Sequence, residues 1–145
     1  MRAVVCRVNR ATVAAEGTLS GRIDRGLLVF LGVMCGDGME QVRWMAEKLV
    51  QLRLFPDEQG KMNRSVKEIG GGLLLIPNFT LAGDARRGTR PSFSDAAPPD
   101  EARPLFEQVI AACGAHGPVA SGVFGAHMDI DAQCDGPITI VVDSP

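Results

Sequence analysis

Two short segments combine residues whose backbone and side-chain groups can take part in binding or chemistry. Residues 77–81, Pro-Asn-Phe-Thr-Leu, follow an apolar run, and the end of a strand is a common place for a site. There, Phe79 can stack on a flat ring and Thr80 can donate a hydrogen bond. The structural alternative is an ordinary strand end with Phe79 in the core.

The second segment is the Gly136-Pro137 step within residues 135–139. A Gly-Pro pair can hold its carbonyl oxygens in a fixed direction, and a cis bond before proline is uncommon enough to mark a deliberate local feature. The structural alternative is a tight turn. Both segments therefore present backbone groups as the main means of contacting a ligand.

Conventional catalytic motifs are missing from the sequence, which has no G-x-S-x-G, H-E-x-x-H or Walker pattern. Cys134 and His127 are seven positions apart, which places them on opposite faces of one strand and prevents a Cys-His pair. His116 and His127 are not at metal-ligand spacing from any cysteine, and no C-x-x-C motif occurs. We expect no metal and no cofactor.

The composition indicates one globular domain. Of 145 residues, 46% are hydrophobic and 22% charged, which suits a single core. Arg7 interrupts the apolar start, so no signal peptide is expected, and no apolar run approaches the roughly 18 residues of a membrane span. We therefore expect a cytoplasmic protein with free thiols and no membrane partner.

The net charge of −2 gives no general attraction to nucleic acid. Any RNA binding must use a local basic patch, and solvated loops are the ordinary interpretation of such clusters. The two candidate patches are Lys61, Arg64 and Lys67, and Arg86, Arg87 and Arg90.

The elements that must position these residues begin with strands. Apolar and alternating patterns predict strands in the first third of the chain at residues 2–8, 12–15, 21–23 and 27–33. Apolar residues at helical spacing then predict a helix over 39–50, with Asp37 as its N-cap. A strand over 52–55 follows.

The first candidate segment comes directly after the apolar run 73–76. This run predicts a central strand buried on both faces, interrupted at Pro77 because proline cannot donate a ladder hydrogen bond. Residues 82–95 are expected to form a polar loop.

A second helix opens with the two prolines at 98–99, because proline suits the first helical position. Pro104 predicts a late start or a kink, and Gly114 or Gly117 ends the helix.

The last part returns to strands around the second candidate segment. Strict alternation over 127–134 predicts a strand with one wet face, 135–137 a turn, and 138–142 a final strand. Strands at both ends with two separated helices predict an α+β fold, and no linker divides residues 1–145. We expect a single domain with a largely antiparallel, barrel-like β core and two main helices.

Taken together, short segments from residue 2 to about residue 143 resemble the D-aminoacyl-tRNA deacylase family. Each match is short, but their order and spacing make the set specific. The matching segments are Arg7-Val8 with Ala11, residues 26–29, 60–63, 79–81 and 90–93, residues 122–126 with Met128, and residues 135–139.

The resemblance implies a homodimeric enzyme that hydrolyses the ester of D-aminoacyl-tRNA, a proofreading step in translation. It implies that Gly136 and Pro137, joined by a cis peptide, enter the partner subunit's pocket, where their carbonyl groups exclude L side chains. Arg7 matches a family arginine that helps to hold this element. Glycyl-tRNA is an implied side substrate, because glycine has no side chain to exclude.

The resemblance also implies a pocket for the 3′-terminal adenosine and its amino acid, lined by Pro77, Asn78, Phe79 and Met128. The family's chemistry is largely that of the RNA: the terminal ribose 2′-hydroxyl assists attack by water, and backbone amides stabilise the oxyanion. A threonine matching Thr80 has been proposed as a nucleophile, although we favour a role in positioning.

Some residues depart from the family pattern. Pro77-Asn78 stands where the family has Ser-Gln, Cys134 where it has Asn, and His127 where it has Asp. A related group that acts on L-alanine misattached to a threonine tRNA is similar at Pro77, and its Gly-Pro bond is trans. A relaxed or L-selective deacylase of the same fold is therefore one alternative, and a non-catalytic tRNA- or nucleotide-binding dimer is another.

Overall fold

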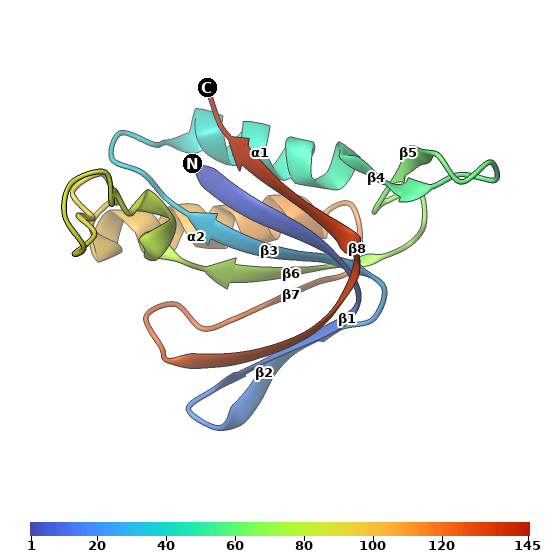
Figure 1. Ribbon diagram of the computed structural model, residues 1–145, viewed down its shortest axis with the longest axis horizontal. Helices are drawn as coiled ribbons and strands as arrows, with labels where there is room; N and C mark the ends of the chain where they lie inside the picture. The colour runs from blue at the N-terminus through green and yellow to red at the C-terminus, as the bar shows by residue number, and fades with distance from the viewer.

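The computed structural model describes residues 1–145 and contains one curved six-stranded sheet with two helices packed on one face (Figure 1). The sheet order is β2-β1-β3-β6-β7, and β8 pairs with the free edge of β1. A two-stranded hairpin, β4-β5, projects from one end (Figure 1). The strands are β1 (Arg2–Ala15), β2 (Thr18–Ile23), β3 (Gly26–Gly32), β4 (Arg53–Pro56), β5 (Met62–Ser65), β6 (Gly72–Pro77), β7 (Val119–Ser121) and β8 (Met128–Asp143); the helices are α1 (Met39–Gln51), α2 (Pro99–Gly114) and the short 3₁₀-helix η1 (Phe79–Ala82).

The predicted α+β class with two main helices and a barrel-like sheet is confirmed. Strand β1 pairs antiparallel with β2, β3 and β8, whereas β6 pairs parallel with β3 and β7. The sheet curls until β2 approaches β7: a Cβ on Gly21 would lie 2.9 Å from the carbonyl oxygen of Ser121. The sheet is therefore nearly closed, with parallel strands on one side.

Strand β6 is buried on both faces, as its continuous apolar sequence predicts. Leu73 and Leu75 face the larger core, which the two helices cover. Leu74 and Ile76 face a smaller core inside the curl of the sheet. This double burial fixes the position of the residues that follow at the strand's end.

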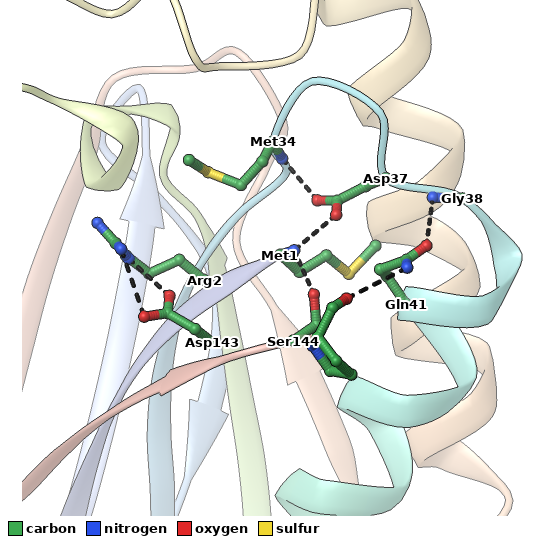
Figure 2. Close-up of polar contacts among 9 residues, drawn as sticks. Met1, Arg2, Met34, Asp37, Gly38, Gln41, Asp143 and Ser144 are labelled. Atoms are coloured by element: carbon green, nitrogen blue, oxygen red, sulfur yellow. Dashed lines mark hydrogen bonds and ion pairs between the residues drawn. The ribbon is translucent and has the colours of Figure 1, made fainter.

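The expectation that Asp37 caps α1 is wrong, because Gly38 occupies the N-cap. The Asp37 carboxylate instead accepts hydrogen bonds from the Met1 amine at 2.7 Å and from the Met34 backbone N–H at 2.6 Å (Figure 2). The Met1 amine also donates to Ser144 at 2.6 Å, so this buried ion pair ties the two ends of the chain to the turn before α1.

Helix α2 begins at Pro99 and continues as one α-helix through Pro104 to Gly114, so the expected late start is wrong. Pro104 lies on the exposed face, and the carbonyl that its missing N–H leaves free belongs to the exposed Asp100. Water can satisfy that carbonyl, which lets the helix tolerate the proline.

Two strand predictions need correction. Residues 2–8 and 12–15 belong to one strand, β1. Residues 135–137 do not turn the chain, because β8 runs through them from Met128 to Asp143. Cys6 pairs with Thr139 and Val8 pairs with Cys134, so residues 135–138 form a four-residue bulge opposite Arg7. The Gly-Pro step is therefore held inside a long paired strand.

Candidate functional site

The first candidate segment turns away from the sheet at the end of β6. The Asn78 backbone N–H donates to the Leu31 carbonyl at 2.8 Å, the last bond of the strand to β3. Asn78 then caps η1: its side-chain oxygen accepts hydrogen bonds from the Thr80 backbone N–H at 3.1 Å and from the Thr80 hydroxyl. Phe79 is 60% exposed, so the alternative that places it in the core is wrong.

A hollow of about 410 Å³ lies beside this segment. It is lined by five of the residues expected at the site, namely Pro77, Asn78, Phe79, Thr80 and Met128. Residues 125–127, just before β8, form its other wall together with Met128 and Ile130 at the start of β8. A Cβ on Gly122 would lie 2.5 Å from the Met128 sulfur, so the glycine leaves room for Met128.

A second hollow, of about 490 Å³, adjoins the first across Pro77, Asn78 and Phe79. It is mostly apolar, and four phenylalanine rings line it. Phe79 meets Phe93 edge to face with ring centroids 5.3 Å apart, and the Arg103 guanidinium lies 5.0 Å from the Phe124 centroid. Sequence reasoning did not assign Phe93, Phe124 or Arg103 to a site, although the matching segments 90–93 and 122–126 contain the two rings.

The second candidate segment is held by Arg7, which lies opposite the bulge in β8. Arg7 Nη1 donates to the Leu54 carbonyl at 2.7 Å. Its Nε lies 2.9 Å from Asp135 Oδ2 but outside hydrogen-bonding geometry, so this contact is an ion pair. Arg7 is largely buried, and it therefore fixes the residue directly before Gly136.

The Gly136-Pro137 peptide is cis, which is the isomer that the family resemblance implies. Gly136 has a φ of 135°, a conformation that L side chains rarely adopt, and a Cβ there would collide with the Ile138 backbone nitrogen. The position therefore requires glycine.

The structure does not bring the two segments together within one chain. Neither hollow is lined by Arg7, Gly136 or Pro137. Strands β1 and β3 lie between β8 and β6, and the Gly-Pro bulge is level with the start of β3 whereas Pro77 is level with its end. A site that uses both segments needs a second subunit.

Comparison with known proteins decides the family. Residues 4–143 match the family described as D-Tyr-tRNA(Tyr) deacylase. Proteins named D-aminoacyl-tRNA deacylase from Anaeromyxobacter dehalogenans and Thermosipho africanus are 51% and 49% identical, each over 99% of this chain and 97% of the relative. The chain belongs to the D-Tyr-tRNA(Tyr) deacylase family.

Solved structures share this fold. One titled c-Myc DNA Unwinding Element Binding Protein superimposes with a TM-score of 0.94 at 35% identity, over 100% of this chain and 99% of its own. Another, titled as a probable eukaryotic D-amino acid tRNA deacylase, has a TM-score of 0.84 over 99% and 98% of the two chains. At 16% identity, the second supports the fold alone.

Within one chain, the only side chain that hydrogen-bonds to Thr80 is that of Asn78. The Thr80 hydroxyl donates to the Asn78 carboxamide, which can accept a hydrogen bond but cannot take up the proton at neutral pH. His127, on the wall of the smaller hollow, lies 3.9 Å from Asp129.

No group of three or more His, Cys, Asp or Glu side chains is placed to hold a metal ion. None of the helices is both long enough and apolar enough to cross a membrane.

Proposed function

We propose that this protein hydrolyses the ester of D-aminoacyl-tRNA in the cytoplasm, releasing the D-amino acid and tRNA. The observation that carries the proposal is the pair of adjoining hollows that meet at the exposed ring of Phe79, in a chain that belongs to the deacylase family. One hollow suits the terminal base of the RNA, and the other suits the esterified amino acid.

The larger hollow has the size and lining for the 3′-terminal adenosine. Its wall is mostly apolar and carries Phe79, Phe93 and Phe124. Stacking of a base on an aromatic side chain is worth about 1–3 kcal/mol. Such binding orients the ribose toward Phe79, where the two hollows meet.

The ester and its amino acid then occupy the smaller hollow, beside Thr80 and Met128. We propose that the ribose 2′-hydroxyl assists attack by water on the ester carbonyl and that backbone N–H groups stabilise the oxyanion. Asn78 holds Thr80 at this point through two hydrogen bonds. An aminoacyl ester is already activated, so this help suffices without a protein nucleophile.

Selection for the D configuration requires the second segment, and we propose that it comes from the partner subunit of a homodimer. Arg7 and the pairing of β8 hold Gly136 and Pro137 in place. Their carbonyl groups would face the α-carbon and exclude an L side chain. Glycine has no such side chain, so glycyl-tRNA would also be hydrolysed.

Mixed dimers test this arrangement. Phe79→Ala removes the ring between the hollows on one chain, and Gly136→Ala displaces the Gly-Pro element on the other, because the new Cβ meets Ile138. The two variants are co-expressed with different tags, and the heterodimer is purified by both tags. Its hydrolysis of D-Tyr-tRNA and L-Tyr-tRNA is then measured.

If the segments act across the interface, the heterodimer has one intact site. It keeps the wild-type preference for D-Tyr-tRNA at half the wild-type rate. The matched control pairs a wild-type chain with a chain that carries both substitutions, and it shows the altered preference of the Gly136→Ala homodimer. If the heterodimer instead lost the preference for D-Tyr-tRNA and the control kept it, the two segments would act within one chain. A protein that is monomeric in solution would exclude the dimer.

A further inference from the structure

A basic loop projects from the rim of the larger hollow. We call residues 84–92 the arginine loop. It is closed at its base by two backbone hydrogen bonds, Asp84 N–H to Ser92 at 2.8 Å and Ser92 N–H to Asp84 at 2.9 Å. The next residue, Phe93, lines the hollow and packs against Phe79. The loop is therefore anchored directly at the proposed binding site for the terminal base.

Two of the three arginines in this loop have no partner in the protein. Arg86 is engaged by Asp84: its Nε and Nη2 lie 2.9 and 2.7 Å from the carboxylate oxygens. These hydrogen bonds lower the pKa of Asp84 to about 2. Arg87 and Arg90 are exposed and make no hydrogen bond or ion pair. They are free to bind an anion.

The other basic cluster differs in both charge balance and position. Lys61, Arg64 and Lys67 share their surface with Asp57, Glu58 and Glu68, and Arg64 pairs with Glu58. This cluster lies on and just beyond the β4-β5 hairpin, at the opposite end of the molecule from the arginine loop (Figure 1). The positive charges of this cluster are balanced by acidic neighbours, and the cluster is remote from the hollows.

We propose that Arg87 and Arg90 bind the phosphates of the RNA strand that leads to the 3′-terminal nucleotide. The inference rests on the proposed function, since it takes the terminal base to lie against Phe79 and Phe93. The backbone of the preceding nucleotides must then leave the hollow across its rim. Asp100 and Glu101 begin α2 next to Pro98 and Pro99 of the hollow's wall, so phosphates would be repelled there.

Binding through phosphates predicts a loss that depends on the length of the RNA and on salt. Each phosphate contact on a single strand contributes about 0.7 to the slope of log affinity against log salt. Replacement of both arginines should therefore reduce that slope by about 1.4 and weaken tRNA binding about tenfold at moderate salt. The same replacement should not change the hydrolysis of an adenosine ester that lacks the preceding nucleotides.

The experiment compares Arg87→Ala/Arg90→Ala with a matched variant that also removes two exposed charges, Lys61→Ala/Lys67→Ala. Three quantities are measured for each: kcat/KM on D-Tyr-tRNA, kcat/KM on D-tyrosyl-adenosine, and affinity for uncharged tRNA across a salt series. The expected result is a loss of about tenfold on both tRNA measurements for the arginine variant alone, with hydrolysis of D-tyrosyl-adenosine unchanged.

Equal effects of the two variants on the tRNA measurements would overturn the proposal. An equal loss of D-tyrosyl-adenosine hydrolysis in the arginine variant would also overturn it, because the arginines would then support the structure of the hollow. If the wild-type protein hydrolysed neither ester, the proposed function would fail. The affinities for uncharged tRNA would still decide whether the arginine loop binds RNA.

Discussion

The two ends of the molecule differ in how their key residues are held. At the end that contains the hollows, Phe79 is exposed and Thr80 rests on a single side chain, Asn78. At the other end, Gly136 lies in the bulge of β8 opposite the largely buried Arg7, and the strand pairs with β1 on both sides of the bulge. We call the first the adaptable end and the second the rigid end, a division that suits the proposed recognition of a chiral centre. Because the two ends are apart in one chain, this division also predicts the dimer.

The largest expected effect tests whether the chemistry at the adaptable end belongs to the RNA. A D-aminoacyl-tRNA that ends in 2′-deoxyadenosine should be hydrolysed at least about 100-fold more slowly, because it lacks the hydroxyl that assists the water. Single-turnover hydrolysis of the two esters measures this. Competition binding provides the control, since both tRNAs should bind equally. Normal turnover of the deoxy substrate would refute RNA-assisted hydrolysis.

The next effect concerns the rigid end. Arg7→Ala removes the ion pair with Asp135 and the hydrogen bond to Leu54, which should cost about 1–3 kcal/mol of unfolding free energy. It should also weaken discrimination between D-Tyr-tRNA and L-Tyr-tRNA roughly tenfold, equivalent to ~1.4 kcal/mol. Urea denaturation and paired deacylation assays measure the two quantities.

Arg22→Ala is the matched control for this variant, because Arg22 pairs with Asp24 on the exposed surface. Its stability should change by less than about 1 kcal/mol, and its selectivity should not change. If Arg7→Ala kept full discrimination while losing stability, Arg7 would support the fold and not the filter.

The smallest effect is expected at Thr80. If its hydroxyl only positions groups, Thr80→Ala should lower kcat/KM less than about tenfold, whereas loss of a nucleophile costs about 10⁴-fold or more. Thr18→Ala, an exposed threonine in β2, is the control and should be neutral. A loss of 10⁴-fold that Thr80→Ser restores would instead identify a nucleophile.

Much of the fold follows from local patterns in the sequence. The double burial of β6 is apparent in four consecutive apolar residues, and both helices appear as apolar residues at helical spacing. The role of Asp37 could not be predicted, because its partner Met1 is distant in sequence and the contact exists only in the folded chain. The bulge at 135–138 was missed for a similar reason: Gly-Pro favours a turn locally, and pairing with β1 overrides that preference.

The site was predictable only in part. The residue pattern pointed to the segments around Phe79 and Gly136, and the smaller hollow does gather the five expected residues around Phe79. The larger hollow depends on Phe93 and Phe124, which come from a loop and from the connection before β8. No spacing pattern in the sequence predicts that such distant residues lie in one site. The separation of Gly136 from the hollows likewise follows from strand order, which local sequence does not specify.

The most direct test of the account is a comparison of D-Tyr-tRNA and L-Tyr-tRNA with the purified wild-type protein. We predict that the D ester is hydrolysed at least about 100-fold faster than the L ester, a difference of ~2.7 kcal/mol in activation free energy. Loss of the L ester should match its rate in buffer. Faster loss of the L ester would support an L-selective deacylase, in line with Pro77. Hydrolysis of neither ester faster than in buffer would contradict the proposed activity.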